Sequence, residues 1–372
     1  MRLTVLHPFA AAAERQDLYA SLERLTGWDI SLVVANGWRN DYDRIQYAAR
    51  HEEFNGSIKA LPVLGSGNIP LHVYRARLSH EIAKSRPDLV YIYHEPYAVA
   101  TYQAMVGLPR DVPVGVYSSQ NIAKRYPLPF RRMEAWVYRR ADFAIAVSQS
   151  VASVLAAKGF SAPIRIIPFH VDVDLIAPGP SWPGATSPLR IGYLGRLVQE
   201  KGVQYLLDAV ARTPNTTVCV AGSGPYEPEL RRRADAQFTS DPGRVQWLGM
   251  LPAAEVPNFL HTVDVLVVPS LTTPSWKEQF GRVVLEAAAA GVPIITSDSG
   301  ELPTVALSLG GGAWSVPEGS SAAISSLLSK LAEDNAFLET SKRAVREAAV
   351  DRYATHAVTC RLAEVLGEFS TS

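Results

Sequence analysis

Residues 278–286 read Glu-Gln-Phe-Gly-Arg-Val-Val-Leu-Glu, and this stretch predicts a loop that turns into a helix. Gly281 lets the backbone turn closely onto a ligand, and residues 282–290 favour a helix. The N–H groups of residues 281–284 would then form an anion site suited to a diphosphate. Glu286 lies four residues beyond Arg282 on the same side of that helix. Its carboxylate can accept both hydroxyls of a ribose, whereas Glu278 precedes the helix, where a sugar beyond the diphosphate would lie.

Taken alone, this pair of carboxylates is open to a structural interpretation, in which Glu278 caps the helix and Glu286 is solvated. A second stretch favours the ligand. Residues 191–202 read as a strand that ends near Gly195, followed by a loop with Arg196 and Lys201. A planar guanidinium and a point charge together suit two adjacent phosphates. Loops at the carboxyl ends of parallel strands are also where open α/β sheets bind ligands.

With these motifs in place, the chain resembles a family 4 glycosyltransferase (GT4), a retaining enzyme of the GT-B fold. The resemblance covers most of the chain and rests on an ordered set of motifs. These are His94-Glu95-Pro96, Gly195-Arg196 with Lys201-Gly202, residues 221–225 (Ala-Gly-Ser-Gly-Pro), Trp247-Leu248-Gly249, residues 278–286, and the run from Glu286-Ala287 to Gly291-Val292-Pro293.

The resemblance implies transfer of a sugar from a nucleoside diphosphate to an acceptor hydroxyl, with retention at the anomeric carbon. His94 resembles the family histidine that contacts the transferred sugar, although a histidine at a strand end is also often a structural donor. The catalytic residues expected are His94, Arg196, Lys201 and Glu278. The donor-binding residues expected are Gly195, Gly222, Trp247, Leu248, Phe280, Gly281, Arg282, Val283 and Glu286. Ser118, Asn121 and Tyr126 fall after the fourth strand, where an acceptor could approach.

Three departures from the family pattern concern loops. The first loop often carries paired glycines, but residues 8–13 read Pro-Phe-Ala-Ala-Ala-Ala here. Alanine disfavours positive φ, so a phosphate contact from this loop is in doubt. The usual Asn-Gly-Val-Asp is Phe-His-Val-Asp at residues 169–172, and Gln279 replaces a small residue.

The fold expected is α/β, with two Rossmann-like doubly wound domains facing across a cleft. Short apolar strands alternate with helices, which is typical of parallel sheets covered on both faces. Predicted strands are residues 3–7, 30–35, 89–94, 114–118, 143–148 and 164–167, then 189–194, 217–221, 245–248, 263–269 and 293–296. Predicted domains are an acceptor-side domain at 1–178, a Pro- and Gly-rich linker at 179–188 and a donor domain at 189–351. A terminal helix within 352–372 is expected to pack back toward the first domain.

Composition agrees with a cytoplasmic enzyme. The chain has 372 residues, 47% of them hydrophobic, and a formal net charge of zero, so bulk charge does not point to nucleic acid as a partner. The apolar start is cut short by His7 and Pro8, which favours a first strand over a signal peptide. No segment approaches the roughly 20 apolar residues needed to span a bilayer.

Residues 121–140 form a local basic and aromatic stretch. Six cations (Lys124, Arg125, Arg131, Arg132, Arg139 and Arg140) face a single acid, Glu134, and are interleaved with aromatic residues. Such a stretch suits peripheral contact with an anionic membrane. The alternative is a solvated helix face with Trp136 turned to the core. The expected partners are therefore a nucleotide sugar, an acceptor glycan, glycolipid or small molecule, and a membrane surface if this contact occurs.

Other functions remain as alternatives. A GT-B-type nucleotide-sugar epimerase or phosphorylase, or a non-catalytic sugar-nucleotide-binding subunit, could share the donor half. A glycoside hydrolase is disfavoured because one of the two carboxylates is assigned to ribose, and no Gly-x-Gly-x-x-Gly follows the first strand as a dinucleotide enzyme would require. No cofactor and no metal are expected, because Arg196 and Lys201 can neutralise the diphosphate. The donor sugar, its base and the acceptor cannot be read from spacing.

Overall fold

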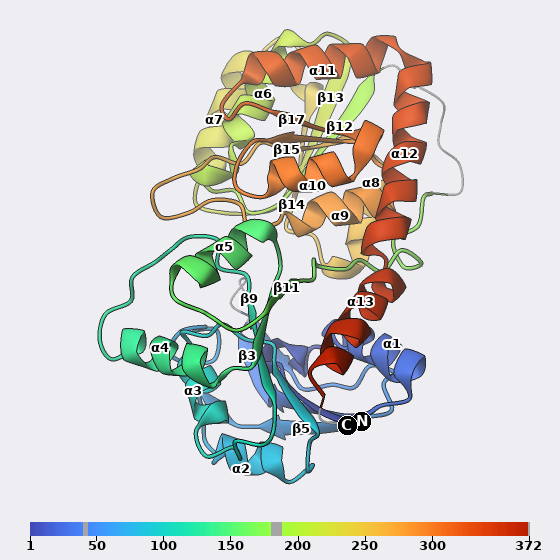
Figure 1. The fold of residues 1–372 in the computed structure, drawn as a ribbon. Coiled ribbons are helices and arrows are strands. Elements are labelled where there is room, and N and C mark those ends of the chain that lie inside the picture. The colour runs from blue at the N-terminus through green and yellow to red at the C-terminus, as the bar shows by residue number, and fades with distance from the viewer. Residues whose placement is uncertain (40–43, 180–187, 371–372) are drawn as a thin grey trace. The chain divides into compact units, whose positions relative to one another are not determined.

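The structure is a computed structural model that describes residues 1–39, 44–179 and 188–370. It divides into two compact units, one formed by Met1–Pro168 with Thr355–Ser372 and the other by Phe169–Ala354 (Figure 1). The first unit thus ends earlier than residue 178, because the segment after Pro168 packs on the second unit. Arg346, for example, donates to the carbonyls of Val173 and Ile176. Most of the predicted linker at 179–188 lies outside the described residues.

Unit 1 contains a seven-stranded parallel sheet in the order β11-β10-β9-β8-β1-β2-β5. Its central strands are fully buried apolar runs, as expected for a sheet covered on both faces. The strands are β1 Arg2–Leu6, β2 Asp29–Ala35, β5 Ser57–Leu61, β8 Leu89–Ile92, β9 Val114–Ser118, β10 Phe143–Ala146 and β11 Ile164–Ile166. Two small antiparallel pairs lie outside this sheet, β3 Gly37–Arg39 with β4 Ile45–Tyr47 and β6 Val63–Leu64 with β7 Val73–Tyr74.

Helices connect and cover the strands of unit 1. The terminal helix α13 packs against α1, and α4 packs against α3. The helices are α1 Asp17–Thr26, α2 Leu78–Ala83, α3 Val99–Met105, α4 Phe130–Arg140, α5 Gln149–Ala157 and α13 Thr355–Glu368. Residues Pro8–Ala11 form a short 3-10 helix directly after β1. The alanines of this loop adopt a tight turn without positive φ.

Unit 2 is built on a six-stranded parallel sheet in the order β14-β13-β12-β15-β16-β17. Helices α6, α7 and α11 share one apolar core with the central strands, and α12 packs against α9. The strands are β12 Leu189–Leu194, β13 Thr216–Ala221, β14 Val245–Gly249, β15 Val265–Val268, β16 Ile294–Ser297 and β17 Ala313–Val316. The helices are α6 Val203–Arg212, α7 Glu227–Gln237, α8 Val256–Leu260, α9 Arg282–Ala289, α10 Leu302–Ser308, α11 Ser321–Glu333 and α12 Asn335–Tyr353.

The prediction of two parallel-sheet α/β domains is confirmed, and its errors lie at sheet edges. Strands β5 and β17 were not predicted. Both are edge strands that are only partly buried, so they lack the continuous apolar run that marks a central strand. The predicted terminal helix is also interrupted, because Ala354 has extended backbone angles and bridges to Val171. Helix α12 therefore ends at Tyr353 and α13 begins at Thr355.

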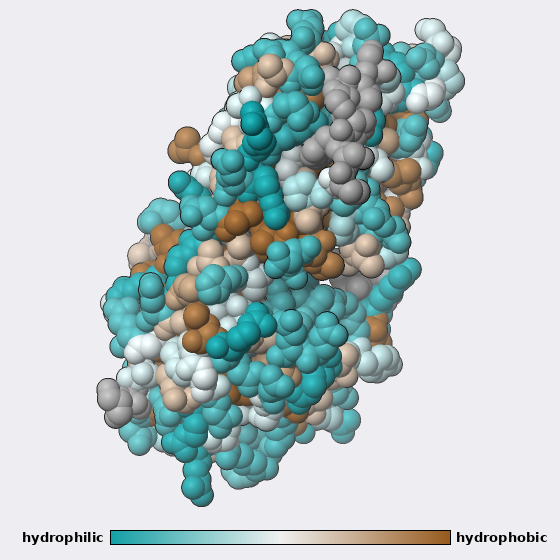
Figure 2. Space-filling view, turned by 90° about the vertical axis from the view of Figure 1, so that its right-hand side faces the viewer, coloured by the Kyte–Doolittle hydropathy of each residue, from teal (hydrophilic) through white to brown (hydrophobic). Residues whose placement is uncertain are grey.

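The surface of the described part of the chain is mainly polar. Hydrophilic residues cover most of the face drawn in Figure 2, and hydrophobic residues occupy smaller areas between them. None of the helices in the described ranges combines the length and the apolar character that a membrane span requires.

Candidate functional site

The predicted donor residues of unit 2 come from loops at one edge of its sheet. Gly195, Arg196 and Lys201 follow β12, Gly222 follows β13, and residues 278–286 follow β15. Because these strands are parallel, their carboxyl ends meet at the same edge. This is the edge at which open α/β sheets bind ligands.

A partly buried ion pair joins two of these loops. The Lys201 ammonium lies 2.5 Å from Glu278 Oε2, and the Ser270 hydroxyl donates to the same oxygen over 2.9 Å. The ammonium also lies 4.9 Å from the centroid of the Trp276 ring. The carboxylate of Glu278, a residue only 7% exposed, is thus held in a fixed position. The structure brings together the predicted phosphate cation and the predicted sugar-binding acid.

Gly281 makes the turn that the sequence predicted. Its φ is +73°, and it directly precedes α9. A Cβ at this position would lie 2.7 Å from Leu302 Cδ2, so both backbone angle and space favour glycine. The N–H groups of residues 281–284 were expected to be free to bind an anion, and for Val284 this expectation is wrong. The Val284 N–H donates to the Gly281 carbonyl over 2.8 Å, which leaves the earlier positions as the anion-binding candidates.

Glu286 and Arg196 carry charges that are not satisfied locally. The half-buried Glu286 carboxylate accepts no hydrogen bond from the described residues, and desolvation raises its pKa despite the opposing charge of Arg282. The exposed Arg196 side chain makes no ion pair within the same ranges. A desolvated carboxylate on helix α9 and an uncompensated guanidinium on the loop after β12 are typical of a ligand site.

Two glycine loops meet backbone to backbone beside these charges. A Cβ on Gly222, whose φ is +143°, would lie 1.8 Å from the Gly195 carbonyl oxygen. The Gly222 N–H donates to the Gly249 carbonyl over 2.7 Å, and the Gly195 N–H to that of Ala221 over 3.0 Å. The close approach explains why these positions hold glycine.

The side chains of three other predicted donor residues have different surroundings. The Phe280 ring is buried and meets Phe169 and Tyr353 edge to face, so its side chain belongs to the core of unit 2. The Trp247 ring lies under the guanidinium of Arg231 at 4.8 Å, whereas the neighbouring Leu248 is 43% exposed. The remaining predicted residues, Arg282 and Val283, occupy the first turn of α9.

In unit 1, Glu95 organises the loop after β9. Its carboxylate accepts hydrogen bonds from the Ser118 hydroxyl over 2.8 Å and from the Ser119 N–H and hydroxyl over 2.7 and 2.9 Å. Burial raises the pKa of Glu95, and these hydrogen bonds oppose the rise. The acid thus joins the ends of β8 and β9. Its side chain is engaged by these serines, and α3 begins only at Val99, so Glu95 does not cap that helix.

His94 is buried at the end of β8, with 1% of its surface exposed. Burial, aided by the neighbouring His72, lowers its pKa to about 3, so the ring is neutral near pH 7. Its Nδ1 lies 3.4 Å from the Thr101 hydroxyl. His94 therefore offers a neutral imidazole at the carboxyl edge of the sheet in unit 1.

The other two acceptor-side candidates lie on the loop after β9. Asn121 is 2% exposed. Tyr126 stacks on Tyr97 with ring centroids 4.4 Å apart, and the Lys158 ammonium lies 4.7 Å from its ring. Burial raises the pKa of Tyr126 to about 12, so the phenol keeps its proton and can donate a hydrogen bond.

The sequence interpretation missed several residues at these edges. Ser270, which fixes Glu278, directly follows the predicted strand at 263–269, and its position at a strand end was a usable signal. His72 packs against His94 in unit 1, and Trp38 packs against His72. Trp38 and His72 lie on a short antiparallel pair and in a turn, where no clear periodicity develops, so no pattern marked them as site residues.

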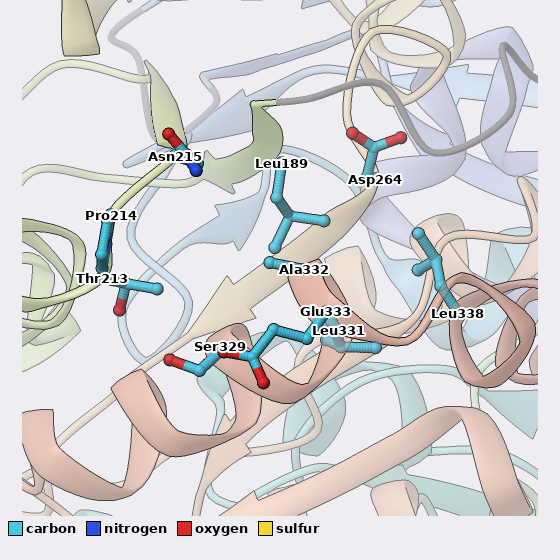
Figure 3. A pocket seen from close by; sticks show the side chains of 10 residues that line it. All are labelled: Leu189, Thr213, Pro214, Asn215, Asp264, Ser329, Leu331, Ala332, Glu333 and Leu338. Atoms are coloured by element: carbon cyan, nitrogen blue, oxygen red, sulfur yellow. The ribbon is translucent and has the colours of Figure 1, made fainter.

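One cavity of unit 2 lies at the opposite edge of its sheet. It has a volume of about 200 Å³, and its lining includes Leu189, Asn215 and Asp264, at or just before the starts of β12, β13 and β15 (Figure 3). The Asp264 carboxylate is already held by the Arg190 guanidinium in a bidentate ion pair of 2.9 and 3.0 Å. None of the predicted donor residues lines this cavity, so the candidate site is the carboxyl edge.

Two parallel-sheet units, one with cations, carboxylates and a glycine turn at its carboxyl edge, define a GT-B-type glycosyltransferase. Comparison with known proteins supports this class. Residues 16–175 match the family model "Glycosyltransferase Family 4" and residues 182–350 match "Glycosyl transferases group 1". The chain belongs to the family 4 glycosyltransferases, which transfer a sugar from a nucleotide sugar to an acceptor.

Individual relatives are distant. The chain is 28% identical to a 2-deoxystreptamine glucosyltransferase of Streptomyces kanamyceticus, over 68% of each chain. It is 29% identical to a glycogen synthase of Mycobacterium tuberculosis, over 75% of this chain and 68% of the relative. Among solved structures, Anabaena HepE in complex with UDP is similar with a TM-score of 0.73 and 18% identity, covering 99% of this chain and 100% of HepE.

Proposed function

We propose that the protein is a retaining glycosyltransferase whose donor is held at the carboxyl edge of the sheet in unit 2. Arg196, Lys201 and the N–H groups at the start of α9 bind the diphosphate. Glu286 binds the ribose, and Glu278 binds the transferred sugar. The observation that carries this proposal is the Lys201–Glu278 ion pair, because it joins the phosphate and sugar candidates in one constellation.

The charges of this site suit a leaving diphosphate. As the bond between the anomeric carbon and the phosphate oxygen breaks, negative charge grows on the phosphate. Fixed cations and a helix N-terminus then stabilise the transition state more than the ground state. The acceptor oxygen bonds to the anomeric carbon on the same face, and its proton passes to the departing phosphate oxygen. This route retains the configuration without an enzymic nucleophile, and it requires no metal ion where Arg196 and Lys201 neutralise the diphosphate.

The names of the relatives indicate which classes of acceptor to consider. They are named for 2-deoxystreptamine, for glycogen and, at 32% identity over 61% of this chain, for phosphatidylinositol monomannoside. These names represent a small molecule, a polysaccharide and a glycolipid. We propose that the acceptor of this chain comes from one of these three classes. The alternative functions, an epimerase, a phosphorylase or a non-catalytic subunit, differ in releasing no nucleoside diphosphate in response to an acceptor.

A donor screen followed by product stereochemistry tests the function. Thermal shift and hydrolysis assays over UDP-, GDP-, ADP- and dTDP-sugars identify the donor. Proton NMR of the early product with an accepted acceptor then reports the anomeric configuration. We expect nucleoside diphosphate release that depends on acceptor, and a product with the configuration of the donor. Inversion would exclude the proposed mechanism, and failure of every nucleotide sugar to bind would exclude the proposed donor site.

We also propose that the enzyme works in the cytoplasm, with helix α4 in peripheral contact with an anionic membrane. Arg131, Arg132 and Arg139 are exposed and make no ion pairs with described residues. The single acid, Glu134, is buried and paired with Lys158 at 2.5 Å, so it does not offset them at the surface. Each cation near an anionic surface contributes on the order of 1 kcal/mol. The aromatic rings of α4 contribute less, because Trp136 packs on Tyr102.

Sedimentation with liposomes decides the membrane contact. Salt-sensitive binding to anionic vesicles but not to neutral ones, lost in the double variant Arg131→Glu/Arg132→Glu, would support it. The matched control is Arg231→Glu/Arg232→Glu on α7 of unit 2, which should bind as the wild type does. Absence of binding at low salt would exclude the contact and favour a soluble acceptor.

A further inference from the structure

Four aromatic residues meet at the carboxyl edge of the sheet in unit 1. Phe9 follows β1, Trp38 lies in β3 just after β2, His94 follows β8, and His72 ends the turn between β6 and β7. The centroids of the His72 and His94 rings are 4.8 Å apart, and that of Trp38 is 4.9 Å from His72. Phe9 stacks on His94 at 5.7 Å. We call these four residues the aromatic cluster.

Hydrogen bonds fix the tautomer of His72. Its Nδ1 lies 3.2 Å from the carbonyl oxygens of both Asn68 and Ile69. Carbonyl oxygens can only accept, so Nδ1 carries the proton. Burial lowers the pKa of His72, which keeps the ring neutral. Nε2 is therefore an acceptor with a lone pair, and it has no hydrogen-bond partner among the described residues although it is fully buried.

His94 presents a second nitrogen of the same kind. The Thr101 hydroxyl donates its proton to the Glu95 carbonyl over 2.8 Å, so it can only accept from His94 Nδ1. His94 Nε2 is then also an acceptor, and it too is buried without a partner in the described part of the chain. An unsatisfied buried polar group costs about 1–3 kcal/mol. Two such groups on adjacent rings, at the ligand-binding edge of a sheet, require a reason.

The turn that carries His72 is built to hold the ring still. The Asn68 N–H donates to the Gly65 carbonyl over 3.0 Å, and the Asn68 carbonyl accepts from the His72 N–H over 3.0 Å. The Asn68 side chain accepts from the Leu71 N–H over 3.1 Å. These bonds orient the Nδ1 side of the ring toward its own turn. The Nε2 side of the ring makes no such bond to the turn.

We propose that His72 is a specificity-determining residue of the reaction, and that its Nε2 atom accepts a hydrogen bond from a hydroxyl group of a sugar beside His94, the residue that resembles the family histidine. A neutral acceptor pair suits hydroxyl donors and does not suit a phosphate. Of the four rings in the aromatic cluster, that of Phe9 can provide apolar surface for the ring carbons of a sugar. Phe9, unlike the two imidazoles, remains partly exposed, so the sugar approaches on the side of Phe9. The inference rests on the proposed glycosyl transfer and concerns residues outside the donor charges.

Two substitutions separate recognition from structure. In His72→Asn the amide nitrogen takes the place of Nδ1 and keeps the donor to Asn68 and Ile69, but the Nε2 acceptor is lost. In His72→Gln the amide oxygen can lie near the position of Nε2 and restore an acceptor. His80→Asn is the matched control, because His80 is an exposed histidine on α2.

The test compares these variants on the accepted nucleotide sugar and on its monodeoxy analogues. We expect His72→Asn to lower kcat/KM about tenfold or more with the parent donor. With the analogue that lacks the recognised hydroxyl, the same substitution should cost less than about twofold. His72→Gln should recover part of the activity, and His80→Asn should behave as the wild type does. Such coupling is the signature of a direct contact.

Binding measurements identify the sugar that is recognised. If it is the transferred sugar, His72→Asn weakens binding of the nucleotide sugar without acceptor and leaves nucleoside diphosphate binding unchanged. If it is the acceptor, the change appears in the acceptor KM, and deoxy acceptors show the coupling instead. A loss of equal size with every donor and acceptor would overturn the inference and make His72 structural. Should His72→Asn fail to fold, the wild type and His72→Gln remain to be compared on the deoxy substrates. If each of these two proteins loses activity to the same extent with every deoxy substrate, so that no single hydroxyl group is recognised, the inference is overturned as well. Failure of the wild type to bind any nucleoside diphosphate would instead count against the proposed function.

Discussion

The carboxyl edges of the two sheets have the same backbone plan and opposite chemistry. The edge in unit 2 carries charges, with Lys201 bound to Glu278 and with Arg196 and Glu286 lacking partners in the described ranges. The edge in unit 1 carries the Glu95 carboxylate, which Ser118 and Ser119 hold. Around the buried rings of His72 and His94 this edge is neutral and aromatic, and we call that part the neutral edge. Under the proposed function, the parallel sheets fix the edge at which a ligand binds, and the loops decide which ligand it is. Charge suits a diphosphate whose charge grows during reaction, and neutral acceptors suit hydroxyl groups.

The largest effect should come from removing a cation of the charged edge. Arg196→Ala or Lys201→Ala should lower kcat by roughly 10²-fold or more, comparable with losing one oxyanion donor. Stability should change little for Arg196→Ala, because its side chain is exposed. Steady-state kinetics with the accepted donor, alongside thermal unfolding, measure both quantities. Near-full transfer by folded Arg196→Ala would show that the diphosphate lies elsewhere.

The two carboxylates of the charged edge should differ from each other. Glu286→Gln keeps the size of the side chain but weakens ribose binding, so it should mainly raise the donor KM. Glu278→Gln should mainly lower kcat, because the proposed function assigns Glu278 to the moving sugar. Each effect should be about tenfold to 100-fold, because a charge-assisted hydrogen bond contributes roughly 1.5–3 kcal/mol. Equal weakening of nucleoside diphosphate binding by both variants would contradict the assignment of Glu278 to the sugar.

The neutral edge should make folding sensitive to acid. The pKa of His94 falls to about 3 in the folded chain from 6.5, so between these values the unfolded chain binds the extra proton. Stability is therefore fully present above pH 6.5 and falls as the pH drops, by up to about 1.4 kcal/mol per pH unit. Urea unfolding of His94→Gln at pH 7.5 and 5.0 should show a smaller difference than the wild type. The exposed control His80→Gln should match the wild type, and an unchanged difference in His94→Gln would contradict the neutral state of the ring.

The smallest effect expected is that of chelation. If Arg196 and Lys201 neutralise the diphosphate, transfer should survive EDTA within about twofold. The control is the same assay with added Mg²⁺. Complete loss of transfer in EDTA that Mg²⁺ restores would show that a divalent ion shares the charged edge.

The charged edge was more predictable from sequence than the neutral one. Arg196, Lys201 and the stretch 278–286 stand at fixed positions beside apolar strands and a helix, so their placement at one sheet edge follows from topology. The direction of the Phe280 ring could not be read, because it depends on Phe169 and Tyr353, far away in the chain. The contact between Lys201 and Glu278 also required the structure, since spacing does not show which charges pair.

The residues of the neutral edge come from short elements whose sequence patterns are weak. Trp38 and His72 come from strands of two or three residues and from a turn, where neither helical nor strand periodicity develops. Phe9, Trp38 and His94 come together because β8, β1 and β2, the strands that precede them, are neighbours in the sheet. The central strands were predicted because burial on both faces demands apolar runs. The edge strands β5 and β17 were missed because partial exposure relaxes that demand.

A calorimetric titration of the accepted nucleoside diphosphate tests the central claim most directly. The wild type and Arg232→Ala, an exposed arginine of α7 paired with Glu229, should bind with the same affinity. Arg196→Ala and Glu286→Gln should each bind about tenfold more weakly or worse, because each loses a charged contact to the nucleotide. Equal affinity of all four proteins would contradict the placement of the donor at the carboxyl edge of unit 2.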